Sequence, residues 1–327
     1  MSTKSDILAV LEAERSRHIS GQELANSLGL TRTAVWKAIK TLEAQGHKIC
    51  AVPNKGYKLT EESDVLSPES VLQFLPEPMR GNQIITYKTL DSTNTELKRL
   101  ALDGAAHGTI LLAEEQTQGR GRGGKSFFSP YGTGLYMSVL LRPNKKSDTQ
   151  MITIGAAVAV SKAIEEQTGK PAEIKWVNDI YLGGRKVCGI LTEAATDFES
   201  GGIESIVVGI GINCTAPAEG FPEELSFSAG SLDSSGLLRS RLAAAIAREI
   251  IEGFEAGYEN RNLIDEYRSR SILTGKTISF QKEDKTLSGK VMGIDDSGGL
   301  MLELEGGEKL TLHSGEVSLG YIKPDKA

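Results

Sequence analysis

Hydrophobic positions at helical spacing open the chain and are interrupted by turn residues. Those between positions 7 and 11 recur on one face of a first predicted helix. Ser20 followed by Glu23 forms a capping box that predicts the start of a second, short helix, and Gly29 predicts its end. The start of the chain is therefore expected to form two helices joined by a turn.

A third helix is predicted after Thr31, whose side chain can cap it. Val35, Ile39 and Leu42 recur at core spacing, so the basic and hydroxyl residues between them face outward. Helix, glycine turn and helix, at about Gly21–Leu42, form a helix-turn-helix pattern, whose last helix enters the major groove of DNA. The DNA contacts expected on this helix are Thr31, Arg32, Thr33, Lys37 and Lys40.

Residues 47–59 read as two short strands around a PNKG turn and predict a wing beside these helices. Lys55 and Lys58 would then contact DNA phosphates. Residues 15–60 carry eight Lys or Arg against two acids, a local charge of +6 in a protein of net charge −6. Such a local excess is typical of nucleic-acid binding. A helical accessory domain that contacts protein instead of DNA remains an alternative.

Acids, serines and prolines dominate residues 63–82, which predict a linker with one short helix. Pro76 and Pro78 prevent a longer helix there.

Strands predominate in the central region and often follow one another without an intervening helix. They are predicted at residues 84–90, 109–115, 134–142, 173–178 and 206–214, with a hairpin through Gly183 and Gly184. A long apolar helix is predicted at 151–166, and a helical part at 237–270 closes the region. This order favours a mixed, largely antiparallel α+β sheet over a doubly wound one. From residue 275, short alternating strands between glycine turns predict a small β-barrel.

The composition is that of an ordinary soluble protein: 327 residues, 39% hydrophobic and 24% charged. No apolar run approaches the roughly 18 residues that span a bilayer. The N-terminus does not resemble a signal peptide, so a cytoplasmic location without a membrane partner is expected. Three widely spaced cysteines and four isolated histidines argue against disulfides, a zinc site or a histidine triad. No metal held by a dedicated protein cage is expected, and the cysteines are interpreted as small buried residues.

The strongest candidate for chemistry is a basic, glycine-rich loop at residues 116–129, QTQGRGRGGKSFFS. Its four glycines allow positive φ and close approach of the backbone to a ligand. Arg120, Arg122 and Lys125 supply positive charge and donors suited to phosphate oxygens. On composition alone, an exposed basic turn or an RGG-like nucleic-acid segment remains an alternative.

The DSTN segment, residues 91–94, is predicted as a strand-to-helix turn. Thr93 and Glu96 form a second capping box. The hydroxyls, the amide and the free backbone N–H groups of this turn suit a small polar ring or a carbonyl group.

Five segments together carry a family resemblance. They are DSTN (91–94), Q-x-x-GRGR-x-G (116–124), KWVND (175–179), GRKVCGIL (184–191) and GIGIN (209–213). With both flanking domains, they resemble the bifunctional biotin protein ligases that are also biotin operon repressors. The resemblance spans the whole chain and occurs in the family's order.

The resemblance implies four parts of the chain. A winged helix-turn-helix domain would cover residues 1–62, and the linker residues 63–82. A biotin- and ATP-binding catalytic domain of the biotin/lipoate ligase type would follow at residues 83–271. An SH3-like small β-barrel would occupy residues 272–327.

The implied activity joins biotin to a lysine of the biotin carboxyl carrier protein of acetyl-CoA carboxylase or a similar carboxylase. MgATP would first activate biotin to biotinyl-5′-AMP, which would also be the corepressor for operator DNA. Because one such DNA-binding domain makes few base contacts, a homodimer on a two-part site is expected. A lipoate-type ligase and a noncatalytic biotin-sensing repressor remain alternatives.

The resemblance also implies roles for individual residues. The residues expected to bind biotin are Ser92, Thr93, Asn94, Gln116, Arg120, Gly121, Arg122 and Lys186, with Gly119 giving backbone approach. Those expected to bind ATP and the adenylate are Arg122, Lys125, Phe127, Trp176, Asn178 and Asn213. The expected catalytic residues are Arg120, Arg122 and Lys186, which neutralise charge at phosphorus, and Asp179, which is hypothesised to assist deprotonation of the acceptor lysine.

Four residues depart from the family pattern. Gly123 and Lys125 stand where arginines are usual in the loop, and Val177 stands where KWPND has proline. Phe127 falls at a tryptophan position. Because a phenyl ring offers less stacking area than indole, weaker retention of the adenylate is expected.

Overall fold

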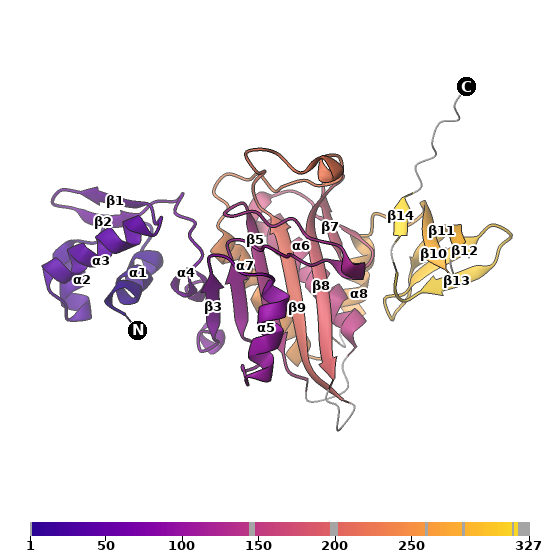
Figure 1. Cartoon of the computed structure of the whole chain (residues 1–327), viewed down its shortest axis with the longest axis horizontal. Coiled ribbons are helices and arrows are strands. Elements are labelled where there is room, and N and C mark those ends of the chain that lie inside the picture. The colour runs from indigo at the N-terminus through magenta and orange to yellow at the C-terminus, as the bar shows by residue number, and fades with distance from the viewer. Residues whose placement is uncertain are drawn as a thin grey trace.

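The computed structural model describes residues 2–143, 148–196, 202–258, 261–282, 285–315 and 317–319. A small helical unit lies at one end of the long axis, a seven-stranded sheet with its helices in the middle and a small β unit at the other end (Figure 1). The α+β class is therefore confirmed. Within the described ranges, no helix is both long and apolar enough to cross a membrane.

The N-terminal unit contains the predicted helices and wing. Its elements are α1 (Thr3–Ala13), α2 (Gly21–Leu28), α3 (Arg32–Ala44), β1 (Ile49–Val52) and β2 (Gly56–Leu59), with β1 and β2 antiparallel. The Ser20 hydroxyl accepts from the Glu23 N–H (3.0 Å), and the Thr31 hydroxyl accepts from the Ala34 N–H (3.1 Å). Gly29 ends α2 with φ of 64°. The Ser20 and Thr31 caps are therefore confirmed. The Ser20–Glu23 capping box is only half formed, because the Glu23 carboxylate pairs with Arg17 instead of accepting from the backbone N–H of Ser20.

Residues 63–82 form an ordered, packed connection. It contains α4 (Pro68–Leu72) and the 3₁₀ turn η1 (Glu77–Met79), and its apolar side chains join the core of the central sheet. Arg15, in the turn after α1, donates to the Ser63 carbonyl (2.8 Å), and Gln73 donates to Glu12 of α1 (2.6 Å). The predicted short helix is confirmed, and the segment is also fixed to both of its neighbours.

The central sheet has the strand order β3-β4-β5-β9-β8-β7-β6. Its strands are β3 (Ile84–Tyr87), β4 (Ile110–Ala113), β5 (Gly134–Leu141), β6 (Glu173–Lys175), β7 (Asp179–Leu182), β8 (Arg185–Thr196) and β9 (Ile203–Asn213). Only the β3–β4 pair is parallel among the described ladders. The predicted mixed, largely antiparallel sheet and the hairpin between β7 and β8 are therefore confirmed.

Two predicted strands extend three residues too far. The strand expected at residues 84–90 ends at Tyr87, because residues 88 and 89 form a bend. The strand expected at residues 173–178 ends at Lys175, because residues 176–178 form the tight turn that leads into β7. The Trp176–Val177 peptide bond in this turn is cis.

Helices cover both faces of the sheet. α5 (Thr93–Leu102) packs on one face through Leu97 and Ala101, which contact Leu140 of β5 and Val207 of β9. α6 (Thr149–Thr168), α7 (Arg239–Glu255) and α8 (Arg261–Ser269) lie on the other side (Figure 1). Two 3₁₀ turns, η2 (Arg122–Gly124) and η3 (Glu223–Leu225), lie in the loops at one end of the strands.

The C-terminal unit is a five-stranded antiparallel sheet of order β13-β12-β11-β10-β14. Its strands are β10 (Thr277–Lys282), β11 (Lys285–Ile294), β12 (Leu300–Leu304), β13 (Lys309–Leu312) and β14 (Val317–Leu319). The predicted short strands are confirmed, and closure into an SH3-like barrel stays a prediction. The indole N–H of Trp176 donates to the Gly298 carbonyl (2.9 Å), and Arg268 Nε donates to the Ile294 carbonyl (2.7 Å), so two side chains attach this unit to the central domain.

Arg239, the first residue of α7, links the connecting segment of residues 63–82 to the central sheet. Its side chain is 8% exposed, and it pairs with Asp64 (2.6 Å) and with Glu114 at the end of β4 (2.7 Å). It also donates to the Asp64 carbonyl (2.6 Å) and to the Gly134 carbonyl (3.0 Å). Three segments that are distant in sequence therefore share one buried guanidinium.

Arg239→Met is expected to lower the unfolding free energy by about 3–5 kcal/mol, because the buried Glu114 and the half-buried Asp64 lose their cation. Arg248→Met is the matched control on the same helix. Its pair with Glu249 is solvent-exposed, with side chains 42% and 37% exposed, and such pairs contribute about 0–1 kcal/mol. Urea unfolding followed by circular dichroism measures both, and equal midpoints would contradict the structural role of Arg239.

Candidate functional site

Three glycines hollow the face of the sheet that carries α5. Gly209 and Gly211 share a face of β9 with Val207, since alternate residues of a strand point the same way. Gly189 of β8 is paired with Gly211 across the ladder. A Cβ added at Gly211 would lie 2.5 Å from the Phe127 ring, and one at Gly209 would lie 2.1 Å from Asn94 Oδ1. These positions are therefore restricted to glycine by what lies above them.

A cavity of about 330 Å³ lies over this hollow. The sequence-predicted site residues that line it are Ser92, Thr93, Asn94, Gln116, Arg120, Gly121, Arg122, Lys125, Phe127, Trp176, Asn178, Asp179 and Lys186. Asn213 and Gly119 are not among the lining residues. The Asn213 amide donates to the Gly230 carbonyl (3.0 Å) and so holds the loop after β9.

A chain of hydrogen bonds between two segments forms the polar wall of the cavity. Gln116 Oε1 accepts from the Thr93 N–H (2.8 Å) and from the Thr93 hydroxyl (3.1 Å), and Gln116 Nε2 donates to the Ser129 hydroxyl (2.9 Å). The predicted capping box of Thr93 and Glu96 is therefore wrong. Ser92 precedes the helix without a side-chain cap, and Gln116, from the glycine-rich loop, accepts from the free N–H at the start of α5.

Asn94 is 3% exposed and is fixed by three partners. Its Nδ2 donates to the Leu191 carbonyl (3.1 Å) and to Glu193 Oε2 (2.8 Å), while its Oδ1 accepts from the Ser138 hydroxyl (2.7 Å). Both amide hydrogens are thereby used within the protein. The amide oxygen keeps one lone pair for a donor in the cavity.

The glycine-rich loop folds back on itself as a narrow hairpin. The Phe127 N–H donates to the Gly119 carbonyl (2.9 Å), and the Gly121 N–H donates to the Lys125 carbonyl (2.7 Å). Of the loop's four glycines, Gly123 and Gly124 adopt positive φ, at 62° and 75°, and the expectation for the other two is wrong. Gly119 is needed for close packing within the loop, because a Cβ there would lie 2.3 Å from the Phe127 carbonyl oxygen.

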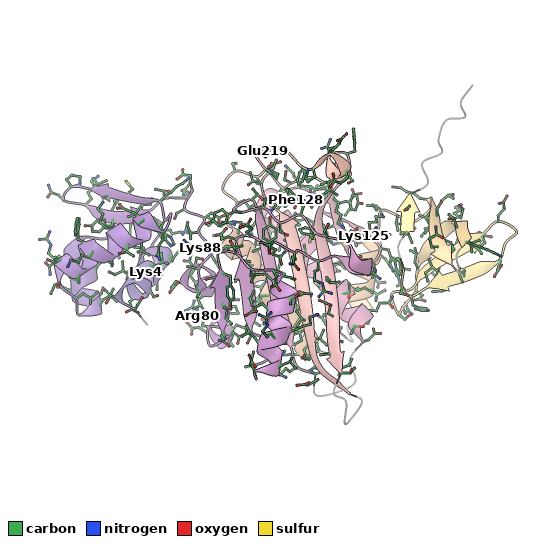
Figure 2. All side chains as sticks on the ribbon, viewed as in Figure 1. Lys4, Arg80, Lys88, Lys125, Phe128 and Glu219 are labelled. Carbon is green, nitrogen blue, oxygen red and sulfur yellow. The ribbon has the colours of Figure 1, made fainter. Side chains whose placement is uncertain are left out.

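Three of the cations that line the cavity each lie beside a partner. Lys186 Nζ lies 2.7 Å from Asp179 Oδ1, and Arg120 lies 3.3 Å from Glu193. Arg122 donates to Asn178 Oδ1 (3.2 Å). These cations come from the loop and from β8, so the fold gathers positive charge at one end of the hollow. Figure 2 places Lys125 on the side of the central domain that faces the C-terminal unit.

Two aromatic residues of the predicted set have different surroundings. Phe127 packs over Gly211 and meets Tyr136 edge-on, with ring centroids 6.5 Å apart. Trp176 is 4% exposed and mainly anchors the C-terminal unit through its indole N–H. A nucleotide-binding role stays a prediction for both.

Sequence reasoning missed several residues of the site. Gly189, Gly209 and Gly211 form its floor, and the alternating glycines of GIGIN were the signal, because period-two glycines share one face of a strand. Tyr181 also lines the cavity, and burial, with Asp179 nearby, raises its pKa to about 12. Glu193 lies beyond the motif that ends at Leu191, and no local signal pointed to it.

A second cavity, of about 510 Å³, lies on the other side of the glycine-rich loop. Arg120, Gly121 and Arg122 of the loop and Ile190 and Leu191 of β8 line both cavities, so the two cavities adjoin there. The start of α6 and residues 313–314 of the C-terminal unit complete the second one.

The candidate DNA surface lies on α3 and the wing. Thr31, Arg32, Thr33, Lys37, Lys40 and Lys55 are exposed, and Lys58 is half-buried. Trp36, which the sequence reasoning omitted, is 52% exposed on the same helix and faces a concavity between α3 and the wing that also includes Arg32 and Tyr57. Lys40 pairs with Glu43 (2.7 Å), which reduces its free charge.

Cys188 and Cys214 are buried as predicted, and Cys50 is exposed, contrary to the prediction. Cys50 lies on β1 of the wing, where its side chain is left uncovered. Among the described residues, no three His, Cys, Asp or Glu side chains gather in a group that could hold a metal ion.

Family models cover all three units of the chain. The biotin/lipoate A/B protein ligase family matches residues 86–213, an HTH domain matches residues 3–58 and the biotin protein ligase C-terminal domain matches residues 274–320. The bifunctional ligase/repressor BirA of Bacillus subtilis (strain 168) is 35% identical over 326 residues, which cover 97% of this chain and 98% of BirA. The chain belongs to the biotin protein ligase family.

Further relatives match most of this chain. The bifunctional ligase/repressor BirA of Escherichia coli (strain K12) is 31% identical over 308 residues, which cover 92% of each chain. A biotin protein ligase from Aquifex aeolicus, solved in complex with biotin and ATP, aligns with a TM-score of 0.62 and 29% identity. It covers 72% of this chain and 97% of its own. Membership in the family therefore rests on both sequence and fold.

Proposed function

We propose that this chain ligates biotin to a lysine of the biotin carboxyl carrier protein of acetyl-CoA carboxylase, or of a similar carboxylase, and represses genes of biotin synthesis and transport. It would do so in the cytoplasm, with ATP as the activating substrate. The observation that carries the proposal is one cavity in which a polar wall, a glycine floor and several cations, among them Arg120, Arg122 and Lys186, converge. The cavity occurs in a chain 35% identical to a bifunctional ligase/repressor over nearly its full length.

The first step joins biotin to AMP. A biotin carboxylate oxygen attacks the α-phosphorus of ATP, the bond to the β-phosphate oxygen breaks, and pyrophosphate leaves. No general base is needed, because the carboxylate is already ionised at neutral pH. Arg120, Arg122 and Lys186 would neutralise the phosphate charge and align the reacting groups. Asn178 and Asp179 would hold two of these cations in place before the ligand arrives.

The polar wall suits the ureido ring of biotin, which has one carbonyl and two N–H groups. Thr93 and Gln116 line the cavity as a linked set of donors and acceptors, Ser129 supports Gln116, and Ser92 is next to them. Asn94 Oδ1 can accept from a ureido N–H with its remaining lone pair. Phe127 would cover the ligand from the loop, above the hollow left by Gly211.

Magnesium fits the site as a partner of ATP. With no cluster of metal ligands among the described residues, the ion would be held mainly by phosphate oxygens, which is its usual mode in nucleotide sites. When bound, it neutralises phosphate charge. The residues of this chain supply the remaining positive charge.

The second step transfers biotin to the acceptor. The lysine amine attacks the acyl carbon of biotinyl-5′-AMP, AMP leaves, and the amine loses a proton. A lysine pKa near 10.4 makes the neutral amine about 4.6 kcal/mol less favourable at pH 7. We assign Asp179 as the group that assists this deprotonation, since it lines the cavity beside Lys186.

Repression would use the N-terminal unit. Biotinyl-5′-AMP would act as corepressor and favour a homodimer, because two winged domains are needed to read a two-part operator. Arg32, Thr33 and Trp36 lie on the exposed face of α3 that would enter the major groove. The wing would add phosphate contacts through Lys55 and Lys58.

Purified protein with Mg²⁺ and no acceptor is expected to exchange pyrophosphate into ATP when biotin is present and not when lipoate or octanoate replaces it. Isotope exchange measures this first step alone. Exchange with lipoate would favour a lipoate-type ligase. Biotin binding without exchange would favour a noncatalytic repressor.

Asp179→Asn is expected to slow transfer from preformed biotinyl-5′-AMP to the carrier lysine by more than tenfold, because an amide cannot take the proton. Rapid quench measures the transfer. Hydroxylamine, a nucleophile that is neutral at pH 7, serves as the control acceptor and should react at nearly the wild-type rate. An equal loss with hydroxylamine would mean that Asp179 acts only through Lys186.

Arg32→Ala and Trp36→Ala are each expected to weaken operator binding by at least about fivefold, since a lost base contact costs roughly 1–3 kcal/mol. Pyrophosphate exchange should stay unchanged. Fluorescence anisotropy at several salt concentrations measures the DNA affinity and its salt dependence. Lys4→Ala on α1 is the control, because Lys4 lies outside the α3 and wing surface. Loss of exchange together with DNA binding would contradict separate sites.

A further inference from the structure

Glu193 on β8 links Asn94, beside the polar wall of the cavity, to Arg120 of the glycine-rich loop. Its Oε2 accepts from Asn94 Nδ2 (2.8 Å), and its Oε1 lies 2.9 Å from Lys98 Nζ and 3.3 Å from Arg120. Its side chain is 20% exposed. One carboxylate thus contacts the polar wall, helix α5 and the glycine-rich loop.

This carboxylate stays ionised at neutral pH. Burial alone would raise the pKa of Glu193, but hydrogen bonds from Lys98 and Asn94 outweigh it, so the pKa lies below its ordinary value. An ionised carboxylate can only accept hydrogen bonds. It therefore requires a donor from Asn94.

The orientation of the Asn94 amide follows from this requirement. Glu193 and the Leu191 carbonyl both accept, so Nδ2 faces them, and Oδ1 accepts from Ser138. The reversed amide would place its oxygen against two acceptors. Asn94 consequently presents an acceptor to the cavity, which matches the N–H of a ureido ring.

The same carboxylate holds Arg120 at the cavity. The Arg120 side chain is 47% exposed, and it forms an ion pair with Glu193 (3.3 Å). The arginine lines the cavity on each side of the loop. Without this partner, a long and half-exposed side chain on a glycine-rich loop would occupy many rotamers, and ordering it would oppose catalysis.

We propose that Glu193 is a positioning residue that fixes both the amide of Asn94 and the guanidinium of Arg120. It would couple recognition of the biotin ring to placement of a phosphate-neutralising arginine. This inference rests on the proposed ligase function and extends it to a residue outside the matched motifs. Glu193 would act through the other two residues and would not contact the reacting atoms.

Glu193→Gln preserves the size of the side chain and removes its charge. Calorimetry without nucleotide measures the biotin dissociation constant, and single-turnover adenylation at saturating biotin and ATP measures the chemical step. Each is expected to worsen by about tenfold, the lower range for loss of a hydrogen bond to a charged group. A variant within twofold of wild type in both measurements would overturn the proposal.

A double-mutant cycle separates the two arms of the proposal, which are the effect of Glu193 through Arg120 and its effect through Asn94. In an Arg120→Gln background, Glu193→Gln should lower the adenylation rate less than twofold further, because the arginine that it positions is already gone. It should still raise the biotin dissociation constant about tenfold through Asn94. A full additional tenfold loss of rate would show that Glu193 does not act through Arg120, and would overturn that arm.

Glu96→Gln is the matched control. Glu96 lies on α5, accepts from Tyr87 and pairs with Arg99, and it does not line either cavity. It should leave both measurements unchanged, and thermal unfolding of each variant checks the fold. Absence of exchange in the wild type would contradict the ligase function, while the biotin affinities of the two glutamine variants would still decide the Asn94 arm.

Discussion

The guanidinium of Arg239 is the constraint on which the arrangement of the central domain depends. It is buried between Asp64 and Glu114, two carboxylates from segments 50 residues apart, and it also binds the carbonyl of Gly134. A buried cation with two anions is stable only if the geometry satisfies every group. The start of α7, the end of β4 and the start of β5 must therefore meet at one point. Gln116 follows Glu114 by two residues, so the Arg239 cluster also helps to position the polar wall of the cavity.

The cavity exists because the sheet has glycines, which lack side chains, at three positions beneath it. Side chains on the α5 face would normally fill the space beneath the helix, as Val207 does further along β9. Gly209 and Gly211 interrupt that row, and Gly189 faces Gly211 on the neighbouring strand. The space receives the Asn94 amide and the Phe127 ring, neither of which leaves room for a Cβ. A rigid sheet thus provides the floor, and the loop above supplies charge. Binding groups on a sheet and a helix end are held more precisely than groups on loops alone.

Local patterns were enough to predict most elements, because helix periodicity, caps and alternating strands depend on neighbouring residues. The third helix, with Val35 inward and Arg32 outward, is an example. Predictions failed where a residue distant in sequence makes the hydrogen bond that a neighbouring residue was expected to make. Thr93 has the sequence of a capping box, yet Gln116 binds it from another segment. Glu193 could not be predicted for the same reason, since its partners are almost 100 and more than 70 residues away in sequence.

The N-terminal unit is joined to this frame by polar contacts as well as by the chain. Arg15 pairs with Glu12 on α1 (2.6 Å) and donates to the Ser63 carbonyl (2.8 Å), one residue before Asp64. Asp64 is held by Arg239, so the orientation of α1 is tied to the buried cluster of the central domain. A free tether would let the DNA-reading helix adopt many orientations, and each would have to be selected again when two copies meet an operator. A fixed connection removes much of that entropic cost before binding. Ligation and repression would therefore share one fixed frame, with the ligation site in the central domain and the DNA-reading helix in the N-terminal unit.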